Sequence, residues 1–575
     1  MTRLAVSISV VLLASLASSQ SAPQITLGGE VGKAATDCSA RFRFAPFDSL
    51  PWLRADLTGE NVSAFDDAEW GHVLKRPFKN YSGDISGRFI EIMAMRSRAG
   101  LAGHPAFRPL LAEIPRVQRP GGYFCASGDI DWQQAIDHPK KGEDALGSRM
   151  LPALWGNARL LCGLVESMRS FPDDQATATA ARSLGDFYVS MLPRFNDPGK
   201  MAEYTAGGTY AAGYVTCWFP AMEGLVKLGS LTGEQKYITA AAAMADFFER
   251  FDQLPVDHAH GMLCNQVSLL MLHEASGKSV YLERIEKRWE ALVQGGYINP
   301  AGGILEKCHV RFVRDEGCAI DDWLRLNLAL GRITGKARYW AMAERTLHNH
   351  LLQNQASKGG FGHRKIVCDK DGACGFGKQI EESTWCCSFH GELGFIQVRD
   401  HLYARSEGLL TCRFALDFSA VDSIGTTTSV LRPGQKPGEV LRQRLSLAGQ
   451  PATVVRVRQP RWADHIRAVD PTDQPVSLQE KDGWLSTAAP VTEVEFIYDG
   501  NLYAETRHCE RLPDSPRKDE LLVVGYGPKL LATKGHVPAS IPWPCTLETL
   551  APLGIQPLSS AMRSEDCQFL FQPAH

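Results

Sequence analysis

The sequence has no excess of charge of either sign. Its 575 residues include 61 lysines and arginines against 64 aspartates and glutamates, a formal net charge of −3, and no basic run stands out. Proteins that bind nucleic acid usually carry a basic patch or stripe, so we expect no nucleic-acid partner. A content of 44% hydrophobic and 22% charged residues is typical of a folded globular protein and excludes a disordered or fibrous chain.

The chain also lacks an apolar run long enough to cross a membrane. The apolar run at residues 4–17 has fourteen residues, short of the ~20 that a spanning helix needs. Arg3 precedes this run, and small or polar residues follow it at residues 18–22. This order is typical of a secretory signal. The sequence therefore predicts a signal peptide over residues 1–19 and a secreted or periplasmic protein without a membrane span.

The Cys-x-x-Cys motif of structural zinc sites is absent, although the chain has fifteen cysteines. An odd number leaves at least one thiol outside any intrachain disulfide. Cys162, Cys217 and Cys264 lie in apolar helical stretches and are predicted to be buried thiols. Cys368 and Cys374 enclose a short loop containing glycine and aspartate, and we predict a disulfide between them.

A short pattern recurs in the first two thirds of the chain: Thr or Ser, then Gly, three residues and Tyr. Each copy follows an apolar stretch with helical spacing. The glycine suits the left-handed residue that ends many helices, and the tyrosine opens the next helix. We therefore expect helical hairpins that break near Gly233, Gly277 and Gly335.

Such hairpins must stack to bury their apolar faces, in an open solenoid or a closed toroid. Five or six hairpins over about 330 residues favour an (α/α)6-type toroid. Near residue 405 the spacing changes to period two, and turn residues separate short segments, which predicts an antiparallel β-sandwich. The expected fold is mainly α with β: a toroid over residues 20–405, with helices at 85–400, and a sandwich over 406–575, with strands at 408–555.

Two segments at the end of the helical part combine residue types that bind metal. Glu316 and Cys318 open one predicted helix, and Cys386 and Cys387 are adjacent in the second segment. One carboxylate and three thiolates would complete the tetrahedral coordination of zinc. Two other interpretations stay open: a disulfide between Cys386 and Cys387, and a simple buried thiol at Cys318.

Several segments, taken in order, resemble the β-L-arabinofuranosidase group, glycoside hydrolase families 127 and 146. Residues 258–304, from HAHG to GGI, resemble its His-bearing helix, TGD-x-x-Y turn and closing GGI. Residues 315–355, beginning DEGC, resemble its E-x-C helix, and EESTWCCSFHGELG resembles its FWCC segment. VRVRQPRWA and LLVVGYGPKLLA resemble two of its strand motifs. The resemblance covers about residues 120–535 and identifies a distant relative.

The resemblance implies a retaining glycosidase with unusual chemistry. It implies that Cys386 is the nucleophile and attacks the anomeric carbon while bound to zinc. Glu316, Cys318 and Cys387 would complete the zinc site. Glu306, in GGILEKC, is the nearest match to the acid/base glutamate of the group.

Other site residues follow from the resemblance or from their place in the predicted helices. The stretch after GGI is shorter here than in the group, so Glu382 and Glu392 are further candidates for the acid. His260 resembles the helix histidine that contacts sugar. The segment SFHGELG departs from the group, which allows for a different substrate. Further candidates for substrate binding are Trp155, Arg159, His309 and His348.

We therefore expect an exported, zinc-dependent retaining glycoside hydrolase that acts on L-arabinofuranosyl or related units of an oligo- or polysaccharide. One alternative is a polysaccharide lyase or unsaturated-uronyl hydrolase on a similar toroid. These chemistries need Tyr/His or Asp pairs and no zinc site with paired cysteines. Another alternative is a carbohydrate-binding relative without activity, which the intact set of zinc ligands disfavours. The sequence carries no signal for an oligomeric state.

Overall fold

The computed structural model describes residues 23–60, 64–67, 72–75, 80–126, 128–138, 148–210, 213–308, 314–368, 374–406, 408–436, 438–507, 521–534, 545–562 and 567–569. The predicted signal peptide lies outside these residues. No helix of the described part has both the length and the apolar character that a membrane span requires.

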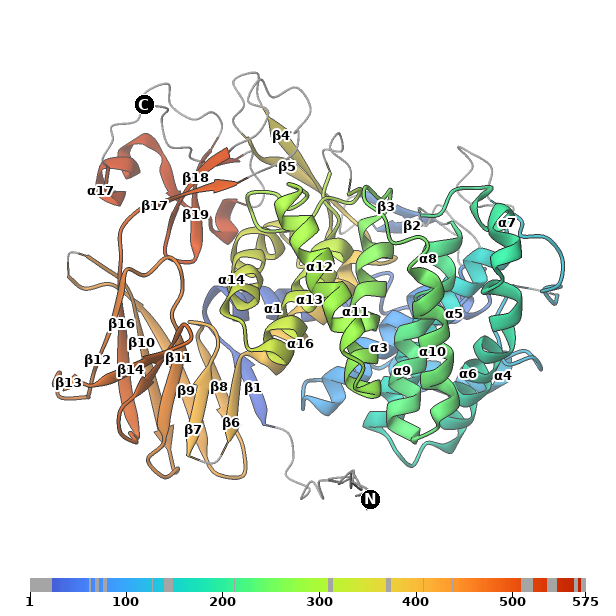
Figure 1. Cartoon of the computed structure of the whole chain (residues 1–575), viewed down its shortest axis with the longest axis horizontal. Helices are drawn as coiled ribbons and strands as arrows, with labels where there is room; N and C mark the ends of the chain where they lie inside the picture. Colours follow the sequence, from blue (N-terminus) through green and yellow to red (C-terminus); the bar gives the residue numbers. More distant parts are fainter. Residues whose placement is uncertain are drawn as a thin grey trace, which may run out of the picture.

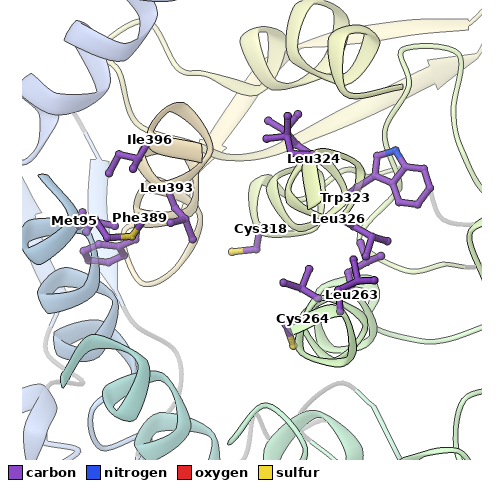
Figure 2. Packing of buried hydrophobic residues seen from close by; sticks show 14 of the residues in the cluster. Met95, Leu263, Cys264, Cys318, Trp323, Leu324, Leu326, Phe389, Leu393 and Ile396 are labelled. Atoms are coloured by element: carbon purple, nitrogen blue, oxygen red, sulfur yellow. The ribbon is translucent and has the colours of Figure 1, made fainter. Parts of the chain in front are cut away.

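The helical part is a closed ring of inner helices, which are labelled in Figure 1. Each inner helix packs on the next one, and the last packs back on the first. Figure 2 shows the contact that closes the ring, where Met95 lies beside Phe389. The predicted toroid is confirmed. Its inner helices are α3 (Asp84–Arg98), α5 (Met150–Ser170), α9 (Ala221–Thr232), α11 (Ala259–Ser276), α13 (Gly317–Thr334) and α16 (Cys387–His401).

Outer helices cover this ring, and their sequences explain why. In α12 the residues Tyr281, Ile285, Trp289 and Leu292 are buried, one apolar stripe on an otherwise polar helix. The inner helix α11 is buried almost all round. The outer helices are α1 (Gly29–Arg41), α4 (Phe107–Val117), α6 (Gln175–Phe195), α10 (Gln235–Phe248), α12 (Ser279–Gln294) and α14 (Ala337–Thr346), and α2 (Leu50–Leu57) packs on α3 and α4.

Three helical hairpins break at the predicted glycines. Gly233, Gly277 and Gly335 follow the last residues of α9, α11 and α13, with φ angles of 75°, 69° and 70°. A positive φ is the left-handed conformation that glycine adopts without strain. The helical repeat predicted from the sequence is therefore confirmed at these positions.

The β part begins with two sheets that form a sandwich. The first sheet has the order β1-β8-β9-β10-β16-β12-β13, and the second has the order β14-β15-β11-β7-β6. All pairings are antiparallel except the one between β7 and β11. The strands are β1 (Gln24–Leu27), β6 (Tyr403–Ser406), β7 (Leu409–Cys412), β8 (Phe418–Val421), β9 (Thr426–Pro433), β10 (Glu439–Ala448), β11 (Val454–Arg458), β12 (His465–Val469), β13 (Pro475–Val476), β14 (Leu478–Lys481), β15 (Trp484–Thr487) and β16 (Glu493–Asp499).

A third sheet was not predicted. Its order is β17-β18-β19-β21-β5-β4, with β20 beside β19, so the last strands of the chain form a sheet of their own with a hairpin from the helical part. Strand β1, from the start of the described chain, likewise joins the sandwich. Both segments thus cross the predicted domain boundary near residue 405. These strands are β4 (Gly362–Cys368), β5 (Cys374–Glu382), β17 (Tyr503–Arg507), β18 (Leu521–Tyr526), β19 (Lys529–Lys534), β20 (Ile555–Pro557) and β21 (Cys567–Phe569).

Short elements complete the described chain. A π-helical turn, η2 (Leu347–Leu351), continues α14 into α15 (Leu352–Asn354). The predicted buried thiols Cys162, Cys217 and Cys264 are confirmed, each with at most 1% of its surface exposed. The remaining elements are α7 (Met201–Thr205), α8 (Tyr214–Trp218), α17 (Leu547–Leu550), β2 (Ala64–Asp67), β3 (His72–Lys75), η1 (Pro198–Lys200), η3 (Ala551–Leu553) and η4 (Ser560–Met562).

Candidate metal centre and its surroundings

Two inner helices bring the four predicted metal ligands together. Glu316 immediately precedes α13 and Cys318 lies in its first turn, while Cys386 precedes α16 and Cys387 begins it. One potential ligand atom from each residue lies within 4.8 Å of all the others. Figure 2 shows the side chain of Cys318 extending from α13 toward α16. The arrangement depends on the close packing of the two helix N-termini.

The glycine between Glu316 and Cys318 permits this packing. A Cβ atom added at Gly317 would lie 2.9 Å from the Cβ of Cys387 and 3.1 Å from Oδ1 of Asn354. Cβ atoms essentially never approach other atoms under 3.0 Å. The Glu-Gly-Cys sequence therefore serves the contact between α13 and α16 as well as the spacing of the ligands.

The residues fit a tetrahedral metal ion. The Sγ of Cys387 lies 3.7 Å from that of Cys318 and 3.6 Å from that of Cys386. Zinc–sulfur bonds of about 2.3 Å at tetrahedral angles would separate two sulfurs by about 3.8 Å. The Oε2 atom of Glu316 is buried without a hydrogen-bond partner, as expected of a carboxylate oxygen reserved for a cation. A disulfide needs sulfurs about 2.05 Å apart, so Cys386 and Cys387 are not bonded to each other.

Ionisation of all three thiols would require a nearby cation. Burial and the neighbouring sulfurs of Cys386 and Cys387 raise the pKa of the Cys318 thiol well above its ordinary value. Three adjacent thiols, two of them fully buried, cannot all ionise without a compensating charge. A bound divalent ion reverses this, because coordination deprotonates a thiol. The donor set of one carboxylate and three sulfurs suits zinc.

Glu306 lies in a group of charged residues that interacts electrostatically with Glu316. Its carboxylate accepts two hydrogen bonds from Arg314, at 2.8 Å each, and Nε2 of His363 lies 3.8 Å from Oε1. Burial and the negative charge of Glu316 raise the pKa of Glu306 above its ordinary value, against the opposing effects of His363 and Arg314. A carboxyl group with a raised pKa is suited to donate a proton near neutral pH.

The two other predicted candidates for the acid lie in buried ion pairs. Arg41 donates to both carboxylate oxygens of Glu382, at 2.7 and 3.3 Å. Glu392 accepts hydrogen bonds from Arg96 and from the hydroxyl of Ser39. Glu306 also has an arginine partner, Arg314, but burial and the charge of Glu316 still raise its pKa. This raised pKa favours Glu306 among the three candidates for the acid.

His260 and Trp155 belong to one hydrogen-bonded cluster. Nδ1 of His260 lies 2.5 Å from Oδ2 of Asp322, and Nε2 accepts from Arg88 at 3.3 Å. Trp155 donates from Nε1 to Asp84, and its ring meets that of His260 edge-on, with centroids 5.3 Å apart. Arg88 also binds Asp84 at 2.9 Å. The structure therefore brings His260 and Trp155 together at the same end of the ring as the sulfurs.

The remaining predicted substrate-binding residues lie elsewhere. Arg159 is fully buried inside the ring and bonds to Glu91 and Glu223, at 3.1 and 3.3 Å. His348 lies in η2, where burial lowers its pKa to about 4. His309 lies outside the described residues.

Sequence reasoning missed several polar residues at the centre. His258 precedes α11, and its Nε2 lies 3.7 Å from Oε1 of Glu316. His390 belongs to the unusual SFHGELG segment, and its Nδ1 lies 2.6 Å from NH1 of Arg88. His363 approaches Glu306, as described above. The segment Asp-His-Ala-His contains two histidines, His258 and His260. Only the fold indicates that His258 approaches Glu316, the candidate metal ligand.

The fold has counterparts among solved structures. A GH127 β-arabinofuranosidase superimposes with a TM-score of 0.61 and 16% identity, over 90% of this chain and 85% of its own. A GH127 β-L-arabinofuranosidase from Geobacillus stearothermophilus T6 gives 0.59 and 13%, over 89% of this chain and 86% of its own. A structure described as a glycoside hydrolase gives 0.59 and 15%, over 89% and 82%. The predicted resemblance to the β-L-arabinofuranosidase group is therefore confirmed for the fold.

Comparisons based on the sequence find no such counterpart. No model of a known protein family matches the chain. No curated protein matches it either.

Proposed function

We propose that this chain is a zinc-dependent retaining glycoside hydrolase whose nucleophile is Cys386. The observation that carries the proposal is the meeting of one carboxylate and three sulfurs within 4.8 Å, at the N-termini of two inner helices of a toroid. When bound, zinc would keep the coordinating thiols deprotonated and protect them from oxidation in an exported protein.

Differences in burial support the choice of nucleophile. Cys318 and Cys387 are fully buried, whereas Cys386 is partly exposed. A nucleophile must reach the substrate, while a purely structural ligand need not. Cys386 also precedes its helix, whereas Cys387 is the first residue of that helix. Cys318, Cys387 and Glu316 are then left to hold the metal.

Glu306 supplies the proton in this proposal. The sulfur of Cys386 forms a bond to the anomeric carbon as the bond to the leaving oxygen breaks, and the Glu306 carboxyl proton passes to that oxygen. The Glu306 carboxylate then takes a proton from water, whose oxygen displaces the sulfur. Two displacements at one carbon restore its original configuration, as in other retaining glycosidases. Arg314 holds the carboxyl group in position through its two hydrogen bonds.

The substrate assignment rests on the likeness in fold. Two of the superimposed structures are β-arabinofuranosidases by name, so we propose L-arabinofuranosyl or related sugar units as the substrate. The flat faces and polar edges of Trp155, His258 and His260 suit a sugar ring and its hydroxyl groups. We further propose that residues 1–19 direct export and that the substrate is an extracellular or periplasmic oligo- or polysaccharide.

The test combines metal analysis with a screen of p-nitrophenyl glycosides. We expect about one zinc per chain, as one four-ligand site requires, and hydrolysis of an L-arabinofuranoside or a related glycoside. Cys386→Ser should abolish hydrolysis, whereas Cys264→Ala, which changes a buried thiol on α11, should retain it. Absence of zinc together with a Cys386–Cys387 disulfide in mass spectrometry would overturn the proposal. Release of an unsaturated uronyl product would favour a lyase instead.

A further inference from the structure

A cavity of about 840 Å³ lies between the toroid and the sandwich, away from the metal ligands. One wall is the turn between α13 and α14, at Thr334–Arg338, and the other belongs to strands β11, β14 and β15 of the five-stranded sheet. Its volume is in the range of pockets that hold small molecules. The charged and aromatic residues that line it are Lys336, Arg338, Arg456, Lys481, Asp482 and Trp484.

The cations on the two walls differ in their partners. Lys336 and Arg338, on the toroid side, form ion pairs with Glu286 and Glu290. Arg456, on the sheet side, has no carboxylate within ion-pair distance among the described residues. It donates from Nε to the hydroxyl of Thr411 at 3.2 Å, and its guanidinium lies 4.9 Å from the ring centre of Trp484.

A nearby arginine makes the contrast clear. Arg458 lies two residues further along β11 and therefore on the same face of the sheet. Its NH2 atom lies 2.7 Å from Oε1 of Glu344, on helix α14. The same face thus carries one arginine that the toroid neutralises and one, Arg456, that faces the cavity with its charge uncompensated.

A second arginine, which interacts electrostatically with Arg456, adds to the positive charge. Arg413 donates to the carbonyl oxygen of His401 at 2.9 Å and lies over the ring of Trp340, again without a carboxylate partner in the described chain. Burial and the positive charges of Arg332 and Arg456 lower the pKa of Arg413 to about 10. Two uncompensated guanidinium groups that repel each other would both be stabilised by an anion.

We propose that this cavity is a second binding site, which takes a carboxylate-bearing saccharide such as a uronate-containing oligosaccharide. Arg456 provides a planar pair of donors that matches a carboxylate, and Lys481 adds an exposed positive charge at the rim. The hydroxyl of Ser486 faces the cavity beside Arg456, as a polar partner for sugar hydroxyls. One carboxylate, Asp482, also lines the cavity, so the anionic character of the ligand follows from Arg456 and Lys481, which together outnumber it. The saccharide character rests on the proposed function.

The test is calorimetric titration of the full chain with trigalacturonate. We expect trigalacturonate to bind, with an affinity that falls as salt is added. Arg456→Gln should lower this affinity about tenfold or more, because it removes a charge-assisted contact. Arg467→Gln is the matched control, because Arg467 is a partly exposed arginine of the other sheet with two carboxylate partners. A neutral arabino-oligosaccharide and inorganic phosphate serve as comparison ligands.

The outcomes separate this site from the catalytic one. Arg456→Gln should hydrolyse a neutral p-nitrophenyl glycoside as the wild type does, and Cys386→Ser should bind trigalacturonate as the wild type does. No binding of trigalacturonate, or equal binding by wild type and Arg456→Gln, would overturn the proposal. Phosphate that binds as tightly as trigalacturonate at the same site would overturn its saccharide character.

Discussion

The Sγ atoms of Cys318 and Cys387 lie 3.7 Å apart, although 69 positions separate the two residues in the chain. The contact exists because α13 and α16 are neighbours in the ring and begin at the same end of it. The distance is too long for a disulfide and close to the edge of a zinc–thiolate tetrahedron. The grouping of these candidate ligands is therefore a property of the closed toroid, not of either segment alone.

Removal of one fully buried ligand should remove the metal. We expect Cys387→Ser to be purified with much less zinc than the wild type, because a serine hydroxyl stays protonated and binds zinc poorly. Cys264→Ala should keep its zinc. A chelator should lower the Tm of the wild type and of Cys264→Ala, since a bound metal stabilises the folded state. The same chelator should leave the Tm of Cys387→Ser unchanged, and equal zinc in all three proteins would contradict the assignment.

Gly317→Ala tests the packing of the two helix N-termini. The added Cβ would lie 2.9 Å from the Cβ of Cys387, so we expect a loss of about 1–3 kcal/mol in the free energy of unfolding, as for other overpacked cores. Denaturant titration measures this loss, and elemental analysis should show weaker retention of zinc. Gly103→Ala is the control, because nothing lies within 4 Å of a Cβ at that position. Equal stability of the two variants would mean that the helices can separate freely.

The proposed nucleophile and acid should respond differently to the leaving group. Cys386→Ser should abolish turnover of every substrate. Glu306→Gln removes a proton donor, so we expect a loss of roughly 10²–10⁴-fold on a natural glycoside. The loss should be smaller on a nitrophenyl glycoside, whose leaving group needs less protonation. Wild-type rates of Glu306→Gln on both substrates would show that another group is the acid.

The pH dependence of activity should report Glu306. Its pKa is raised by burial and by Glu316, and the acid works only while it holds its proton, so kcat/KM should fall as the pH rises through this pKa. Arg314 stabilises the carboxylate and lowers the pKa. Arg314→Gln should therefore raise the pKa and move the alkaline limb of the profile to higher pH, while Arg314→Lys should move it less. A shift to lower pH would contradict this role.

The predicted disulfide between Cys368 and Cys374 has support from the backbone. These two residues are directly opposite each other in the β4–β5 pair, where Cα atoms lie about 4.5–5.5 Å apart, within the range of disulfides. We expect one disulfide-linked peptide containing both residues in the mass spectrum of the unreduced protein. Recovery of both as free thiols after export would contradict the prediction.

Features that depend on a short stretch of sequence, such as the ends of helices, were predicted correctly. The glycines at 233, 277 and 335 end helices as expected, because the left-handed conformation they supply is a local requirement. The four candidate metal ligands were predicted from residue type, and the fold brings them within 4.8 Å of one another. The sheet that β4 and β5 join was not predictable, because a hairpin carries no local mark of the distant strand with which it pairs.

Individual polar residues were harder to assign than segments. Arg159 was predicted to bind substrate, but it lies in a buried ion network with Glu91 and Glu223, inside the ring. Its helix α5 is buried nearly all round. The spacing of apolar residues along α5 therefore could not indicate which of its polar side chains is accessible to a substrate. His258 and His260 are two positions apart, and a small rotation of the helix start decides which one approaches Glu316.

The shared direction of the inner helices has an electrostatic consequence. Each α-helix carries about half a positive charge at its N-terminus, from backbone N–H groups that lack partners within the helix. Glu316 and Cys386 occupy the N-cap positions of α13 and α16, and His258 that of α11, so at least three such partial charges point at one group of sulfurs. The backbone therefore contributes a field that partly opposes the effect of burial on these thiols and favours their ionised form. Successive inner helices of the toroid begin at the same end, so each one adds a partial positive charge there. That end is therefore suited to stabilise negatively charged groups.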